Sequence, residues 1–205
     1  MSRPRSIFAG DTDYTGVPLA DILDHLAAWR DALREHIDVN RNILRRLLEQ
    51  PPSSQVRAGQ DFCEFFIDLL ERFSGDFDRL LAELPAGVRA RHIETVSQMY
   101  RGARDADSTC VAFKRDHHLD ALSPSNRTQH ILAELYQLDR DAVINLFDLS
   151  NVVSRLKTFV DDSPIAMDNA VQTSAINALE LKPNFFGLGI NLNWVIDWLR
   201  SRKKK

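Results

Sequence analysis

The stretch LADILDHLAAWRDALREHIDVNRNILRRL, residues 19–47, decides the fold class. Its apolar side chains recur mostly at steps of three or four residues, the spacing of an amphipathic α-helix. Pro18 stands where a first helical residue is favoured, and Pro51 and Pro52 end the pattern. The stretch therefore predicts one long N-terminal helix of about 30 residues, roughly 45 Å long at 1.5 Å per residue.

Further helical patterns follow in shorter segments, and no stretch of useful length alternates with period two as a strand does. Residues 60–73 have a wide apolar arc, which predicts a helix deep in the core. Ser74 and Gly75 interrupt the pattern, as does Gly102, and we expect helix ends at both places. The sequence predicts an all-α fold, a multi-helix bundle of about seven to nine helices. The residues expected in its core are Phe66, Leu70, Leu132, Leu146 and Phe147.

The chain divides into three segments by composition. Residues 1–16 are polar, contain Pro4, Gly10 and Gly16, and predict a flexible N-terminal arm. Residues 17–181 hold the helical patterns and predict the bundle domain. Residues 182–205 predict an aromatic, glycine-containing turn, an amphipathic C-terminal helix and a basic tail.

The composition is that of an ordinary globular protein: 44% of the 205 residues are hydrophobic and 27% are charged. The formal net charge of −3 gives no global attraction to nucleic acid or anionic lipid, so such binding needs a local patch. Cys63 and Cys110 lie in apolar helical segments, and we expect two buried free thiols in a reducing compartment. Because we find no apolar leader and no run of about 20 apolar residues, we expect a cytoplasmic protein without a transmembrane segment.

No set of residues in the sequence predicts catalysis, a metal site or a cofactor. His25 and His36 share a helix face but lie about 16 Å apart along its axis, too far for one ion. His117 and His118 fall in a polar loop, and His92, on an apolar face, predicts a hydrogen-bonded core histidine. No Gly-x-Ser-x-Gly motif is present, and neither cysteine has an electropositive setting. We therefore expect a non-enzymatic protein with no cofactor and no metal.

Residues 128–147, TQHILAELYQLDRDAVINLF, resemble the core of a helix-turn-helix motif, in which Asp139 would begin the recognition helix. Acidic side chains on the same face, Asp141 and Asp148 among them, would repel phosphates. A DNA-binding regulator is therefore the alternative interpretation, and nucleic acid is a possible but not a favoured partner. The residues that this resemblance implies for DNA contact are Asn126, Arg127, Arg140 and Asn145.

The C-terminal segment carries the least generic pattern in the chain. KPNFFGLGI, residues 182–190, leads into residues 191–202, a short amphipathic helix with two tryptophans, and then into three lysines. Isolated helices of this length are marginal in water, so another surface must cover the apolar side. That surface is the protein's own core, a protein partner or, more weakly, a membrane surface. The predicted partner-binding residues are Phe185, Phe186, Leu192, Trp194, Val195, Trp198 and Leu199.

Two further observations bear on function. The run FFGLGINLN, residues 185–193, resembles C-terminal tails of helical modules from prokaryotic conflict systems, which implies an accessory role in a defence assembly. Arg41, Arg45 and Arg46 form a basic cluster on the first helix that fits either an acidic partner or a solvated charged face. Together the patterns predict a helical protein–protein interaction module, an adaptor or accessory subunit that binds a protein partner or itself.

Overall fold

The computed structural model describes residues 13–121 and 126–161, which all lie in one unit of the chain, Met1–Ala166. These residues form five α-helices: α1 (Leu19–Leu48), α2 (Ser54–Glu83), α3 (Ala90–Asp116), α4 (Arg127–Asn145) and α5 (Leu149–Asp161). Two short 3-10 helices accompany them, η1 (Leu84–Ala86) after α2 and η2 (Leu146–Asp148) between α4 and α5. No strand occurs within the described ranges, and the predicted all-α class is confirmed.

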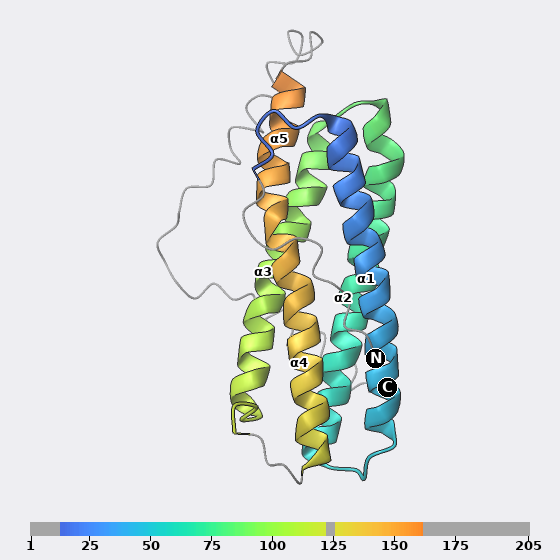
Figure 1. Cartoon of the computed structure of the whole chain (residues 1–205), viewed down its shortest axis with the longest axis vertical. Coiled ribbons are helices and arrows are strands. Elements are labelled where there is room, and N and C mark those ends of the chain that lie inside the picture. Colours follow the sequence, from blue (N-terminus) through green and yellow to red (C-terminus); the bar gives the residue numbers. More distant parts are fainter. Residues whose placement is uncertain (1–12, 122–125, 162–205) are drawn as a thin grey trace, which may run out of the picture. The chain divides into compact units, whose positions relative to one another are not determined.

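The helices run alternately up and down beside one another (Figure 1). α1 packs along α2, α3 packs against α4 and α5, and α4 also packs against α1. Because η2 joins α4 to α5 without a loop, these three elements form one column, and the described residues make a bundle of four columns. Within the described ranges, no helix combines the length and the apolar character needed to cross a membrane.

The described residues form five α-helices, fewer than the predicted seven to nine, and these helices are longer than the sequence patterns indicate. The breaks expected at Gly75 and Gly102 do not occur, because α2 and α3 run through them. A glycine inside a helix costs only about 1 kcal/mol relative to alanine, and continuous burial on both sides outweighs that local cost. The buried stripe of α2 crosses Gly75 without a shift, at steps of four and three residues: Phe66, Leu70, Phe73, Phe77 and Leu80.

Local signals place the helix starts and turns. Ser53 Oγ accepts a hydrogen bond from Val56 N at 3.1 Å and caps α2. Asn126 Oδ1 accepts one from Gln129 N at 3.1 Å and caps α4. Gly87 adopts φ of 122° in the turn from η1 to α3, a conformation that favours glycine. These caps agree with what the local sequence chemistry prefers.

The core predictions are largely confirmed. Phe66, Leu70, Leu132 and Leu146 are each 0% exposed. The prediction was wrong for Phe147, which is only half-buried. Phe147 lies in η2, where the tighter 3-10 turn departs from the α-helical spacing on which the prediction depended. Both cysteines are buried free thiols, as predicted.

Candidate protein-interaction surface

The described surface carries few large apolar side chains, and two of them lie on one pair of packed helices. Among the described residues three are exposed: Leu48 at 65%, Val111 at 48% and Ile144 at 39%. Leu48 ends α1, whereas Val111 lies on α3 and Ile144 on α4. The strip around the latter two is named here the α3–α4 seam. Its members are Tyr100, Arg104, Asp107, Val111 and Lys114 of α3, Tyr136, Arg140 and Ile144 of α4, and Phe147 of η2.

Helical spacing arranges the seam residues in two facing rows. Steps of three and four positions separate the members of each row, and such steps keep side chains on one face of a helix. Across the rows, Asp107 pairs with Arg140, and Tyr100 meets Phe147 edge-on with ring centroids 6.4 Å apart. The rows therefore run antiparallel along a strip of about 20 Å.

Cations lie over aromatic rings at both ends of the seam. The Arg104 guanidinium is 5.2 Å from the centroid of the Phe147 ring. Lys114 Nζ and the Arg140 guanidinium are 5.5 and 6.0 Å from the centroid of Tyr136. Contacts of this kind are worth about 0.5–1 kcal/mol at exposed sites and restrict a long side chain. The seam thus presents cations that are already ordered.

Carboxylates neutralise two of the three seam cations. Arg140 Nε donates to Asp107 Oδ1 at 3.1 Å, and this bond raises the pKa of the guanidinium. Lys114 Nζ donates to Asp120 Oδ1 at 2.5 Å, which raises the pKa of the ammonium. Arg104 contacts Tyr100 Oη at 3.5 Å, and no carboxylate among the described residues pairs with it.

The predicted basic cluster on α1 is largely used inside the bundle. Arg41 pairs with Glu71 of α2 at 2.7 Å, and Arg46 pairs with Glu134 of α4 at 2.9 Å. Arg45 is exposed and has no ion-pair partner within the part of the chain described. Two of the three arginines therefore connect α1 to its neighbours, and the cluster does not form one free basic patch.

The helix-turn-helix prediction was wrong about the secondary structure. Residues 127–145 form the single helix α4, with no turn before Asp139. Asp139, the expected start of a recognition helix, is 0% exposed and lies in the core. The sequence spacing of two packed helices and of one long buried helix is alike, and contact with α1 and α3 decides for the long helix.

The residues implied for DNA contact are not brought together. Asn126 caps α4, and Arg140 is held by Asp107 in the seam. Arg127 and Asn145 are the first and last residues of α4, about 27 Å apart along its axis. The tail residues predicted to bind a partner, from Phe185 to Leu199, lie outside the described residues.

A polar layer, one residue from each column, interrupts the apolar core. Its members are Asn40 of α1, Cys63 of α2, Cys110 of α3 and Asp139 of α4, all 0% exposed. Asn40 Nδ2 donates to Asp139 Oδ1 at 2.6 Å, and Cys63 Sγ donates to the Asn40 carbonyl at 3.1 Å. Asp139 Oδ2 has no hydrogen-bond partner among the described residues.

Burial favours the protonated, neutral forms of the carboxyl group and the two thiols in this polar layer. Burial raises the pKa of Asp139 well above its ordinary value of 3.8, against the lowering effect of the Asn40 hydrogen bond. Burial, with a smaller contribution from Asp139, raises the pKa of Cys63 to about 12 and also raises that of Cys110. A thiol that stays protonated is a poor nucleophile. The described residues contain no group of three or more metal-ligating side chains.

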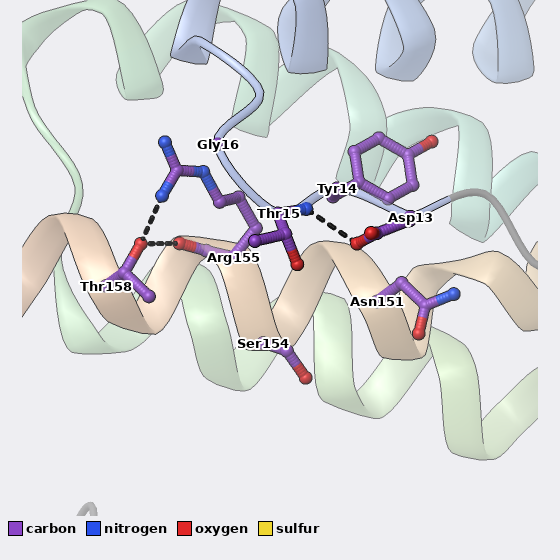
Figure 2. Close-up of a pocket in the computed structure, with 8 residues that line it drawn as sticks. All are labelled: Asp13, Tyr14, Thr15, Gly16, Asn151, Ser154, Arg155 and Thr158. Carbon is purple, nitrogen blue, oxygen red and sulfur yellow. Dashed lines mark hydrogen bonds between the residues drawn. The ribbon is translucent and has the colours of Figure 1, made fainter.

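A pocket of about 450 Å³ lies between residues 13–16 and α5 (Figure 2). Its polar groups are engaged with neighbouring protein atoms: Arg155 Nε donates to the Val17 carbonyl at 2.8 Å, and Arg155 Nη1 donates to Thr158 Oγ1 at 2.8 Å. Thr15 N donates to Asp13 Oδ1 at 2.8 Å. The hydrogen bond from Arg155 to Val17 holds the segment before α1 against α5. The lining residues are Asp13, Tyr14, Thr15, Gly16, Asn151, Ser154, Arg155 and Thr158.

His92 has the structural role that the sequence predicts. Its Nδ1 accepts the backbone N–H of Arg89 at 3.2 Å, at the start of α3. Its Nε2 lies 3.0 Å from Glu83 Oε2, and this hydrogen bond lowers the pKa of Glu83. The Arg91 side chain pairs with the same carboxylate at 2.8 Å. The cluster therefore joins the end of α2 to the start of α3.

Sequence reasoning missed the seam because each of its rows lies on a different helix. The row on α3 crosses Gly102, where the sequence interpretation ended a helix. The row on α4 crosses Asp139, where it began one. The repeat of aromatic, arginine and aliphatic residues at steps of three and four was a usable signal within each row.

No family model matches the chain, and neither a curated protein nor a solved structure matches it.

Proposed function

We propose that this chain is a helical protein–protein interaction module, with no catalytic role of its own, that docks a partner on the α3–α4 seam. The observation that carries the proposal is the placement of Val111 and Ile144, exposed aliphatic side chains beside cations that lie over aromatic rings. Arginine, tyrosine and phenylalanine are enriched in protein interfaces, and arginine and tyrosine also at binding hot spots. An adaptor or accessory subunit needs such a surface.

The order of the seam side chains supports the proposal energetically. Association costs about 0.5–1.5 kcal/mol for each long side chain that must be immobilised. Arg104 and Arg140 already lie against Phe147 and Tyr136. Because folding already restricts these two side chains, a partner that binds them loses less side-chain conformational entropy.

The charges of the seam favour a protein partner over a nucleic acid. Asp107 and Asp120 offset two of its three cations. Asp105, Asp116 and Asp141 are exposed on the same two helices. A polyanion gains from a continuous basic strip and is repelled by interspersed carboxylates. The helix-turn-helix motif on which the alternative interpretation, DNA binding, depended does not form, because residues 127–145 are one helix.

Affinity purification of the tagged full-length chain from its native host tests the proposal. The double variant Val111→Lys and Ile144→Lys should lose a protein that co-purifies with the wild type. Leu48→Lys is the matched control, because Leu48 is equally aliphatic and more exposed but lies at the end of α1. All three chains should first show the same thermal unfolding.

Identical sets of co-purifying proteins for the wild type and the seam variant would contradict the proposal that the partner binds at the seam. Self-association is measured on the same samples by sedimentation velocity. A dimer that the seam variant disrupts would identify the partner as a second copy of the chain. Binding of duplex DNA at low salt that survives the seam substitutions would instead revive the DNA-binding interpretation.

A further inference from the structure

We infer that the partner of the seam is an amphipathic helix that carries a carboxylate aligned with Arg104. The inference rests on the proposed function of the seam and adds the chemistry of the partner. It draws on the register of α3 and α4, on the charges along the seam and on the positions of its two exposed aliphatic side chains.

The register of the two helices shows where the apolar contacts lie. Asp107 faces Arg140 and Tyr100 faces Phe147. In this antiparallel register Ile144 lies level with Ala103, one residue from Arg104, and Val111 lies level with Tyr136. The two aliphatic side chains are therefore about 12 Å apart along the seam.

That spacing suits a third helix laid along the seam. Side chains seven or eight residues apart on one helix face are separated by about 10–12 Å. A partner helix with aliphatic residues at two such positions would contact Val111 and Ile144 together. Helix-in-groove binding uses anchors of this kind. α3 and α4, which carry the two rows, lie side by side (Figure 1).

Arg104 determines the charge that the partner must carry. It lies one residue from the level of Ile144, and no carboxylate in the described part of the chain pairs with it. The Phe147 ring lies 5.2 Å from the guanidinium, and this contact occupies none of the N–H donors of Arg104. A guanidinium forms bidentate hydrogen bonds to a carboxylate, which are stronger and more directional than bonds to neutral acceptors. A glutamate or aspartate within one turn of the second aliphatic anchor meets this requirement.

Selection from a library of displayed single helices, with one randomised face, tests the inference. The bait is the full-length wild-type chain, and clones that also bind the Val111→Lys, Ile144→Lys chain are discarded. Selected helices should carry two aliphatic residues seven or eight positions apart and an acidic residue within a turn of one of them. Arg104→Glu should weaken their binding at least tenfold, measured by fluorescence anisotropy.

A charge exchange makes the test specific. Binding to the Arg104→Glu chain should return when the acidic residue of the selected helix is changed to lysine. Arg101→Glu is the matched control, since Arg101 lies on the same helix but pairs with Glu94 at 3.1 Å; it should change the affinity less than about twofold. Equal unfolding temperatures confirm that the variants are folded.

The outcomes separate the two levels of the argument. Seam-dependent helices that lack an acidic preference, or that bind the Arg104→Glu chain unchanged, overturn the inference and leave the proposed function standing. A selection that yields no helix sensitive to Val111→Lys and Ile144→Lys overturns the inference, whereas the proposed function is overturned only by the co-purification result. Acidic, seam-dependent helices with charge-exchange rescue support both.

Discussion

Asp139 places a carboxyl group inside the apolar core. It is 0% exposed, and only one of its carboxyl oxygens is hydrogen-bonded among the described residues, to Asn40 at 2.6 Å. A buried polar pair of this kind adds little net stability but penalises every packing in which the two side chains fail to meet. We therefore expect Asn40 and Asp139 to fix the register between α1 and α4.

The burial of the Asp139 carboxyl group predicts how the stability of the fold depends on pH. Because burial raises the folded-state pKa of Asp139 above 3.8, the folded protein holds a proton that the unfolded chain releases. The stabilising contribution of this residue is full below pH 3.8 and declines as pH rises toward its folded-state pKa. The slope over that window is about 1.4 kcal/mol per pH unit.

Asp139→Asn mimics the protonated acid and should remove this slope. We expect the variant to be at least as stable as the wild type at pH 7, with the difference shrinking toward pH 4, in urea unfolding measured at both values. Asp141→Asn, two residues along the same helix and exposed, is the control. Burial lowers the pKa of His36, which opposes the trend, and the charge of Asp141 acts against that lowering. The comparison of the wild type with Asp139→Asn therefore carries the test, because Asp141 and His36 are unchanged in both. A difference between wild type and variant that does not change with pH would contradict the assignment.

At the scale of elements, long helices form because their buried stripes continue across local interruptions. α2 shows both ways in which a glycine is accommodated. Gly59 faces the core, where an added Cβ would lie 2.3 Å from Leu132 Cδ2 and 3.3 Å from Leu47 Cδ1. Gly75 is exposed, and an added Cβ there meets nothing within 4 Å. Close approach of three helices requires the first glycine, whereas nothing in the packing requires the second.

Alanine at the two positions should therefore have opposite effects. Gly75→Ala gains helix propensity without a clash and should raise the free energy of unfolding by about 0.5–1 kcal/mol. Gly59→Ala gains the same propensity but crowds Leu132, which is 0% exposed and cannot swing into solvent. Overpacking costs about 1–3 kcal/mol, so this variant should be less stable than the wild type. Urea unfolding of both variants checks the signs, and a stabilising Gly59→Ala would show that the core can yield there.

At the scale of the molecule, the four columns cover one another along their buried stripes. α1 and α2 pair over their lengths, and α3 contacts both parts of the α4–α5 column. The described surface leaves only three large apolar side chains exposed. The helices described therefore supply a core of their own, and the C-terminal segment is proposed to serve binding rather than folding.

Deleting residues 183–205 tests whether the C-terminal segment is needed for folding. The truncated chain should unfold cooperatively, with its midpoint within about 4 °C of the full-length value, since about 1 kcal/mol shifts the midpoint of a chain of this size by about 2–4 °C. Circular dichroism on heating measures it. The double variant Trp194→Ala and Trp198→Ala tests the same expectation for the unfolding midpoint without truncation. Aggregation or loss of cooperative unfolding would show instead that this segment covers the bundle.

The sequence by itself determined the helical class, the buried stripes and several helix starts. These features are local: a side chain's burial follows from its position in a repeat of three and four residues, and a cap from one hydroxyl or amide. Phe66, Leu70, Leu132 and Leu146, the buried thiols, and the structural role of His92 were all predictable on that basis.

Only the tertiary structure decided which helices face one another. Long-range packing carried α2 and α3 through Gly75 and Gly102, and it made residues 127–145 one helix with Asp139 inside. It also placed Phe147 under Arg104 and brought the two rows of the seam together. A periodic pattern specifies that a face is buried but not the partner that buries it, because that choice depends on contacts between residues far apart in the chain.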